Sequence, residues 1–322
     1  MERRSKKSGP ATIESDTTMR IGKYLNSGHE RPFLQNQNHW LDWSALRDHA
    51  PEAGLRDLMA AALEGTPAAQ AAFFTALPGL ETWLARDAAQ LARLFSAHGQ
   101  SGLPQAIAPP CRPLNFICVG LNYRDHALES GAEPPAAPLL FAKTGNAIHA
   151  HGAPIRLPQT SQKVDYEAEL AVVIGRRCHG VSAADALAHV AGYCCGNDIS
   201  ARDFQFADGQ WYRGKSGDGF GPFGPVIVTP KEAGDPHQLR IQLRLNGQKM
   251  QDSNTSNLIF SIPELIAYIS KTITLESGDV IFTGTPPGVG FARKPPVYLK
   301  NADLMEVEIE NLGILANSIV AG

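Results

Sequence analysis

The hydrophobic pattern changes character near residue 110. Between residues 19 and 110 the chain is rich in Ala and Leu, and apolar residues recur at helical spacing over 51–63, 67–77 and 87–98, separated by Gly and Pro. This region does not group reactive side chains. We therefore expect an N-terminal cap or dimerisation module over residues 19–110, a small α/β appendage that ends in a linker at 108–110.

From residue 111 to residue 322, short β-rich runs alternate with turn signals. These runs cover 115–119, 167–174, 226–228, 239–245, 280–283 and 304–309. The βαβ rhythm of a doubly wound sheet is missing from the pattern. The sequence therefore predicts an α+β fold for residues 111–322, built mostly of mixed strands.

Turn and cap residues add detail to this pattern. Asn246-Gly247 follows an apolar alternating run and precedes a polar return, which predicts a β-hairpin. We expect helices over 183–190 and 262–270, because each is preceded by a serine that can cap its first turn. The second of these helices carries Pro263 in its first turn, where proline is tolerated.

Composition excludes several classes of protein. The 322 residues include 29 Lys+Arg and 32 Asp+Glu, a net charge of −3, which argues against a dedicated nucleic-acid binder. With 43% hydrophobic and 19% charged residues, the chain is typical of a soluble globular protein. No uncharged run approaches the roughly 18–20 residues that span a bilayer. Residues 1–18 lack the apolar stretch of a secretory signal, and we expect a disordered tail or a misassigned start ahead of Met19.

The cysteines indicate a reducing compartment. There are five, an odd number, with one adjacent pair and without a C-x-x-C spacing, so neither a disulfide framework nor a thiolate zinc site is expected. Reduced thiols predict a cytoplasmic location.

Two carboxylates precede the most apolar of the predicted strands. Glu167 and Glu169 are followed by Leu-Ala-Val-Val-Ile, which is apolar on both faces, as in a buried strand. Side chains alternate with period 2, so both glutamates point the same way, about 6.6 Å apart along the strand. At the mouth of a buried strand, either one of them keeps a proton or a cation lies between them. The alternative is a solvated face beside Lys163 or Arg176.

A third acid favours the cation. Asp198 lies in another strand-like run with apolar neighbours. Two glutamates and an aspartate, completed by water or substrate oxygens, are a donor set typical of a hard divalent cation, Mg²⁺ or Mn²⁺.

A histidine and a glutamate lie one helical turn apart. If Asn122 caps a short helix, His126 and Glu129 occupy positions i and i+3 on one face. A carboxylate beside an imidazole fixes its tautomer and raises its basicity, which suits proton abstraction from water. A structural histidine is the alternative. His149 and His151 occupy a glycine-containing loop and are expected at the surface.

Residues 209–216 match the pattern G-x-x-x-x-G-K-[ST] literally. Trp, Tyr and Arg fill its interior, and the Gly- and Pro-rich stretch that follows cannot form the helix whose amides hold phosphate. We therefore expect Lys215 to present a cation to an anionic substrate, or to be a surface lysine, and nucleotide binding is disfavoured. In residues 283–290 a strand ends in a tight turn, where Thr285 offers a hydroxyl and an amide to a carboxylate.

Taken together, these segments resemble the fumarylacetoacetate hydrolase family. The resemblance covers residues 116–319. It rests on six blocks in family order, which are 119–126, 141–143, 165–170, 197–203, 214–216 and 283–290. It implies a fold of mixed strands known as a β-roll, a homodimer, and one divalent metal ion for each active site.

The resemblance also implies roles for individual residues. The metal ligands fall on Glu167, Glu169 and Asp198, and the catalytic positions on His126, Glu129 and Lys215. Thr285 falls on the threonine of the Gly-Thr-Pro turn that binds substrate. Arg202, Gln205 and Lys143 fall on positions close to the site in relatives.

The activity implied first is metal-dependent hydrolysis of a C–C bond in a 2,4-dioxo acid, with water activated by the His–Glu pair. A sugar-derived dioxo acid is one such substrate. The alternatives are decarboxylation of oxaloacetate, isomerisation of a hydroxymuconate-type diacid, and ureidoglycolate lysis. A non-catalytic module that binds a small molecule is the alternative outside enzymology. Small 2-oxo acids are the expected partners, without nucleic acid or membrane.

Overall fold

The computed structural model describes residues 19–63, 67–105, 107–207 and 209–322. The tail predicted for residues 1–18 lies outside these residues. Within the described ranges, no helix combines the length and the apolar character needed to cross a membrane. All five cysteines are free, as their number and spacing predict, and all five are buried.

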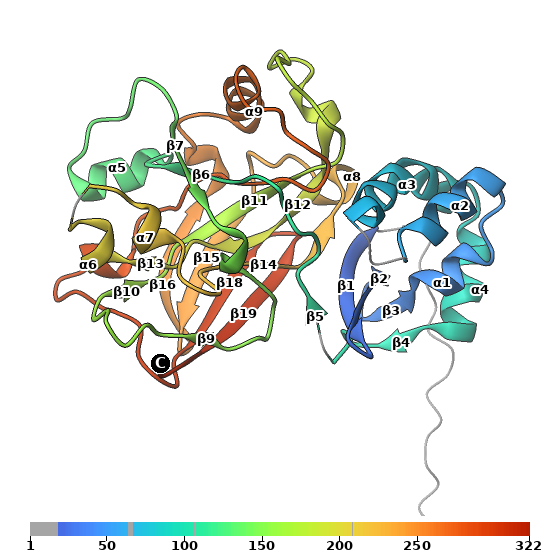
Figure 1. Cartoon of the computed structure of the whole chain (residues 1–322), viewed down its shortest axis with the longest axis horizontal. Coiled ribbons are helices and arrows are strands. Elements are labelled where there is room, and N and C mark those ends of the chain that lie inside the picture. The colour runs from blue at the N-terminus through green and yellow to red at the C-terminus, as the bar shows by residue number, and fades with distance from the viewer. Residues whose placement is uncertain (1–18, 64–66, 106, 208) are drawn as a thin grey trace, which may run out of the picture.

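One open, mixed sheet of twelve strands runs through both halves of the chain. Its order is β4-β3-β2-β1-β14-β12-β11-β17-β6-β7, with β5 beside β1 and β8 beside β14. The strands are β1 (Arg20–Asn26), β2 (His29–Asn36), β3 (His39–Asp42), β4 (Gln100–Ser101), β5 (Ile107–Ala108), β6 (Phe116–Gly120), β7 (Leu139–Lys143), β8 (Ile148–His149), β11 (Ala168–Ile174), β12 (Val190–Asn197), β14 (Gly221–Val228) and β17 (Val280–Phe282). Because β1 pairs antiparallel with β14, the N-terminal module extends the sheet of the C-terminal part (Figure 1).

A second sheet of five strands lies beside the first. Its order is β16-β15-β18-β19-β9. The strands are β9 (Ile155–Arg156), β15 (Arg240–Leu245), β16 (Gln248–Asn254), β18 (Leu304–Ile309) and β19 (Gly313–Val320). A short separate pair, β10 (Val164–Asp165) and β13 (Ser200–Ala201), completes the strands.

The longer helices belong mostly to the N-terminal module, where they gather around β1 to β3 (Figure 1). They are α1 (Trp43–Arg47), α2 (Ala53–Ala61), α3 (Pro67–Arg86) and α4 (Ala88–His98). The C-terminal part has α5 (Arg124–Ser130), α6 (Arg202–Gln205), α7 (Tyr212–Lys215), α8 (Pro230–Ala233) and α9 (Ile262–Ser270), and the 3₁₀ turns η1 (Gly145–Ala147), η2 (Ala186–His189), η3 (Thr255–Asn257) and η4 (Gly290–Ala292).

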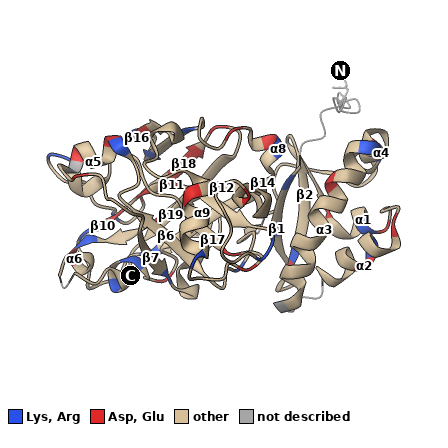
Figure 2. Ribbon diagram, turned by 90° about the horizontal axis from the view of Figure 1, so that it is seen from above, with Lys and Arg blue, Asp and Glu red and all other residues tan. Residues whose placement is uncertain are grey.

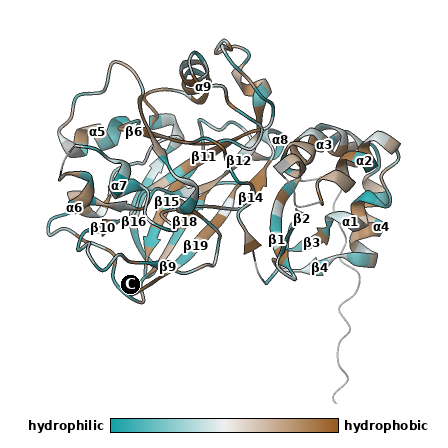
Figure 3. Cartoon of the chain, in the orientation of Figure 1, coloured by the Kyte–Doolittle hydropathy of each residue, from teal (hydrophilic) through white to brown (hydrophobic). Residues whose placement is uncertain are grey.

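Strand β11 separates two hydrophobic cores. Leu170 and Val172 face a core shared with the five-stranded sheet and α9, whereas Ala171 and Val173 face a core shared with the helices of the N-terminal module. Every residue of β11 is buried, and the central strands are correspondingly apolar in Figure 3. The alternation follows from the period of two in a strand. The polar residues next to β11 are therefore held between well-packed layers.

Most of the predicted elements are present. The α+β class dominated by mixed strands is confirmed, as are the hairpin, in which Leu245 pairs with Gln248, and the helix over 262–270, which begins in a capping box. The helix predicted over 183–190 is wrong. Only the turn η2 forms there, and the His189 carbonyl accepts from the amides of Gly175 and Arg176 as the chain enters β12.

We predict that Ile21→Ala lowers the free energy of unfolding by about 2–5 kcal/mol, because Ile21 is fully buried in β1 and pairs with Ile227 of β14. Leu25→Ala, on the same strand but 46% exposed, is the matched control and should change it by less than about 0.5 kcal/mol. Urea titration measures both variants. Equal, small effects would contradict a core shared by the two parts of the chain.

Candidate functional site

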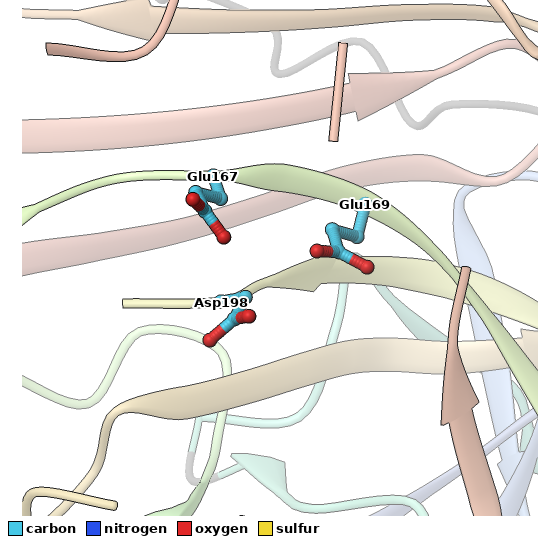
Figure 4. A group of neighbouring side chains, drawn as sticks. All are labelled: Glu167, Glu169 and Asp198. Carbon is cyan, nitrogen blue, oxygen red and sulfur yellow. The ribbon is translucent and has the colours of Figure 1, made fainter. Parts of the chain in front are cut away.

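Three carboxylates meet where β11 begins and β12 ends. Glu169 pairs with Gly196 across the two strands. Two residues away along each chain segment, the amide of Asp198 donates to the carbonyl of Glu167 at 2.9 Å. Residues opposite each other in an antiparallel pair point to the same face, so this register brings the three side chains together. One oxygen from each carboxylate lies within 4.8 Å of the others, and the carboxyl groups face a common space (Figure 4). The predicted convergence is confirmed.

Buried cations surround two of the three acids. The ammonium of Lys215 lies 2.7 Å from an oxygen of Glu167 and 2.7 Å from an oxygen of Asp198. The other oxygen of Asp198 lies 2.6 Å from Lys143, and the other oxygen of Glu167 lies 2.6 Å from Arg202. The alternative of a solvated face beside Lys163 or Arg176 is therefore wrong.

Glu169 has a different environment. It accepts a hydrogen bond of 2.6 Å from the amide of Gly284, and no Lys, Arg or His among the described residues lies within ion-pair distance of it. Burial, reinforced by the charges of Asp198 and Glu167, raises the pKa of Glu169 well above its ordinary value. For Glu167, burial acts in the same direction, but Arg202 and Lys215 outweigh it and the pKa is lowered. At Glu169 the charge of Lys215 acts in the opposite direction but does not outweigh burial and the neighbouring negative charges, and among the described residues no cation forms an ion pair with Glu169.

These residues fit a hard divalent cation. All three donors are carboxylates, buried and within reach of one ion, and one of them has no cationic neighbour among the described residues. Carboxylate oxygens are the ligands that Mg²⁺ and Mn²⁺ prefer. In the predicted set of metal ligands, Glu167, Glu169 and Asp198, each residue can supply an oxygen.

Arg202 and Gln205 lie behind Glu167. The guanidinium of Arg202 donates to Asp165 at 2.9 Å, to Gln205 at 2.9 Å and to Glu167 at 2.6 Å. Asp165 also accepts amide hydrogen bonds from Gly290 and from the residue after it. These contacts fix Glu167 from the side away from the other two acids. Asp165 is buried and was not assigned a role from the sequence, although it lies in one of the recognised blocks.

His126 and Glu129 form a pair on α5. The Nδ1 atom of His126 lies 3.1 Å from a carboxylate oxygen of Glu129, which also accepts from the amide of Gly288. Burial acts to raise the pKa of Glu129, but the hydrogen bonds from His126 and Gly288 outweigh it and the pKa is lowered. The pair is thus held as an anionic carboxylate oriented against an imidazole, with Nε2 of the ring pointing away from this contact.

The predicted cap of this helix is wrong. Asn122 does not cap α5, which follows Tyr123. Instead, the side chain of Asn122 donates to the carbonyls of Phe260 and Thr283, and accepts from the Phe260 amide. Asn122 therefore ties the start of α5 to the loop that follows β17.

That loop, residues 283–290, connects the acids to the His–Glu pair. Its Gly284 amide binds Glu169 and its Gly288 amide binds Glu129, so one short segment positions a carboxylate from each group. Gly288 has φ +100°, and a Cβ there would lie 2.1 Å from the carbonyl oxygen of Met250. Only glycine fits this approach, which explains the Gly-Thr-Pro-Pro-Gly sequence.

Thr285 is held by a residue that the sequence did not single out. Its hydroxyl oxygen accepts from the Gln251 side chain at 2.8 Å, and Gln251 also donates to the Pro286 carbonyl and accepts from the Ala168 amide. The hydroxyl proton of Thr285 can still be donated to a substrate oxygen. A polar residue in the amphipathic strand β16 gave no signal that could reveal Gln251.

Lys215 ends the short helix α7 within the apparent nucleotide-binding motif. A Cβ at Gly214 would lie 2.7 Å from the backbone nitrogen of Gln205, so this glycine allows α7 to pack closely on α6. Strand β14 follows at Gly221, which confirms that no phosphate-binding helix starts at Lys215. The charge of Lys215 is directed at two carboxylates. Burial alone would lower the pKa of its ammonium, but Asp198 and Glu167 outweigh burial and raise it.

We predict that Glu169→Gln stabilises the metal-free protein increasingly as the pH rises. The folded state holds the Glu169 proton more tightly than the unfolded chain, so its contribution to the free energy of unfolding is fully present below the ordinary pKa of 4.5 and is lost as the pH rises toward the higher folded-state pKa. Glutamine keeps a side-chain oxygen that can accept from the Gly284 amide, but it carries no negative charge. Urea titrations in EDTA from pH 5 upward measure the difference, and parallel curves for the two proteins would contradict the raised pKa.

Comparison with known proteins agrees with this architecture. The family model described as fumarylacetoacetate (FAA) hydrolase, C-terminal, matches residues 115–320. An oxaloacetate tautomerase of Bos taurus, named as mitochondrial, is 49% identical over 216 residues, which are 66% of this chain and 69% of that protein. The corresponding human protein is 46% identical over 216 residues, with the same shares of both chains.

Solved structures also cover the N-terminal module. The fumarylacetoacetate hydrolase of Exiguobacterium antarcticum superposes with a TM-score of 0.73 at 32% identity, over 95% of this chain and 100% of that one. The 2-hydroxyhepta-2,4-diene-1,7-dioate isomerase of Mycobacterium marinum gives 0.68 at 31% identity, over 94% and 99%. The chain belongs to the fumarylacetoacetate hydrolase family.

Proposed function

We propose that this protein is an enzyme that depends on a divalent metal, Mg²⁺ or Mn²⁺, and interconverts the keto and enol forms of oxaloacetate or a closely related 2-oxo diacid. The observation that carries the proposal is the buried set Glu167, Glu169 and Asp198, joined through one loop to the His126–Glu129 pair. The relatives named as oxaloacetate tautomerases support this choice among 2-oxo acid reactions.

Tautomerisation requires positive charge near the substrate oxygens and one group that transfers a proton. The substrate loses a proton from C3, negative charge develops on the C2 oxygen, and a proton is added there. A dication held by the three carboxylates would supply positive charge at the 2-oxo and carboxylate oxygens, where the enolate charge appears. The chain itself supplies the base and the donors.

The charge of the site favours an anionic substrate. Asp165, Glu167, Glu169 and Asp198 carry four negative charges when ionised, and Lys143, Lys215 and Arg202 carry three positive ones. A dication therefore leaves this group with one net positive charge. In a buried site such a charge attracts a carboxylate strongly, because the effective dielectric constant is low.

The residues divide the work. Glu129 holds Nδ1 of His126, so the other ring nitrogen, Nε2, takes the proton from C3 and delivers it to the C2 oxygen, which completes the enol. Lys215 holds developing negative charge on the substrate, and Thr285 donates its hydroxyl to a substrate carboxylate. Because proton transfer to carbon is reversible, the same set acts in both directions.

Hydrolysis of a C–C bond in a 2,4-dioxo acid is the second candidate function. It is supported by the structural match to a fumarylacetoacetate hydrolase over nearly the whole chain. The same His–Glu pair would then activate water. The two reactions differ in whether a carbon–carbon bond breaks, which product analysis separates.

The test is a comparison of substrates with metal-stripped protein. We predict that Mg²⁺ or Mn²⁺ restores rapid decay of enol oxaloacetate, followed by its ultraviolet absorbance, without equivalent release of pyruvate. Glu169→Ala should abolish the metal-dependent rate, because it removes the ligand without a cationic neighbour. Since free metal ions also accelerate this reaction, metal alone and Glu169→Ala with metal are the baselines. Faster cleavage of acylpyruvates than tautomerisation would favour the second candidate instead.

His126→Ala tests the proton carrier. We expect its kcat for tautomerisation to fall about 10²–10⁴-fold, the usual contribution of a general base. Leu128→Ala is the matched control, since Leu128 lies on the same helix and is 83% exposed. A kcat for His126→Ala within threefold of that of Leu128→Ala would contradict the assigned role.

A further inference from the structure

Lys143 is a buried cation whose contacts are all with protein. It ends β7, opposite Phe116 of β6, and its side chain is fully shielded from solvent. Residue 221 is a glycine next to this stem: a Cβ there would lie 2.7 Å from the Phe116 ring and 3.1 Å from the Lys143 Cδ atom. The fold thus accommodates an ammonium at a position where burial is costly.

Three oxygens surround this ammonium. Asp198 Oδ1 lies 2.6 Å from it, and it donates to the backbone carbonyls of Ile199 and Lys215, the first at 3.0 Å. The contact with Asp198 is an ion pair without hydrogen-bond geometry, and among the described residues Asp198 Oδ1 accepts no hydrogen bond. Two of its three protons are donated to backbone carbonyls, and its charge is directed at Asp198, whereas the family resemblance implies only that Lys143 lies close to the site.

The three oxygens belong to two segments of the site, the end of β12 with the residues after it and the end of α7. The first is the carboxylate of Asp198, the second is the carbonyl of Ile199, and the third is the carbonyl of Lys215. The carbonyl of Lys215 lies at the end of α7, a helix of four residues, where helical hydrogen bonds cannot satisfy it. Because Lys143 contacts both residues, it fixes Asp198 and the backbone of Lys215 relative to each other.

We propose that Lys143 is a positioning residue that sets the distance between the Asp198 carboxylate and the Lys215 ammonium. An apolar side chain would fill the same space without the cost of burying a charge, but it would leave the Asp198 carboxylate without this ion pair and two carbonyls without this donor. The proposal deepens, and rests on, the proposed function, because it assigns the geometry of the same site.

The variant Lys143→Met keeps the length of the side chain and removes the donors. We expect kcat for oxaloacetate to fall about 100-fold, the usual consequence of misplacing reacting groups by about 1 Å. KM should change less than threefold, because the Lys143 side chain is fully shielded from solvent. The electron paramagnetic resonance spectrum of bound Mn²⁺ should change, since one ligand is less firmly held, while one ion per chain is retained.

Lys231→Met is the matched control. Lys231 is exposed, beyond the far end of β14, and loses the same charge. It should leave kcat, KM and the Mn²⁺ spectrum unchanged. If Lys143→Met fails to fold, Lys143→Arg retains the charge but not the arrangement of donors, and should show the same altered spectrum with a smaller loss of kcat.

Several outcomes would overturn the proposal. A lower melting temperature with unchanged kcat and Mn²⁺ spectrum would assign Lys143 to stability alone, and a tenfold rise in KM with unchanged kcat would assign it to substrate binding. Mn²⁺ binding without turnover of oxaloacetate in the wild type would contradict only the proposed function, since the spectra still test Lys143. A wild type that binds no Mn²⁺ would overturn both.

Discussion

The concentration of charge between two hydrophobic layers is the constraint on which the rest of the structure depends. Four carboxylates and three cations lie buried at one end of β11 and β12. Such groups are stable in a protein interior only when each finds a partner. Glu169 accepts a hydrogen bond from the Gly284 amide but, among the described residues, is the member of the cluster without an ion pair. A buried carboxylate without an ion pair, next to two other carboxylates, is the reason for proposing a metal ion at this end of the sheet.

The fold supplies the precision that this cluster needs. Antiparallel register places Glu167 and Glu169 beside Asp198, and the loop after β17 provides amides for Glu169 and Glu129. Arg202 and Lys143 each contact the carboxylate oxygen that Lys215 does not, Arg202 on Glu167 and Lys143 on Asp198. In the charge colouring of Figure 2, acidic and basic positions are interspersed along both parts of the chain, so the concentration at the site is a local property. It arises from a few residues rather than from overall composition.

The sequence predicted the parts of the site that follow from local pattern. Period-two alternation was enough to place Glu167 and Glu169 on one face, and capping chemistry was enough to predict α9. The roles of Asp165, Gln251 and Asn122 were missed, because their contacts join segments far apart in the chain. The family resemblance placed Lys143 and Arg202 near the site, but it did not predict that they contact Asp198 and Glu167. The cytoplasmic location, the homodimer and the domain boundary at residue 110 stay predictions.

The central claim is that the three carboxylates hold one divalent cation. Anomalous diffraction from crystals grown with Mn²⁺ tests it most directly. The account predicts one strong peak per chain, about 2.0–2.4 Å from an oxygen of each of Glu167, Glu169 and Asp198. Crystals in which this space shows no peak at saturating Mn²⁺, or in which the only peak lies elsewhere on the chain, would contradict it.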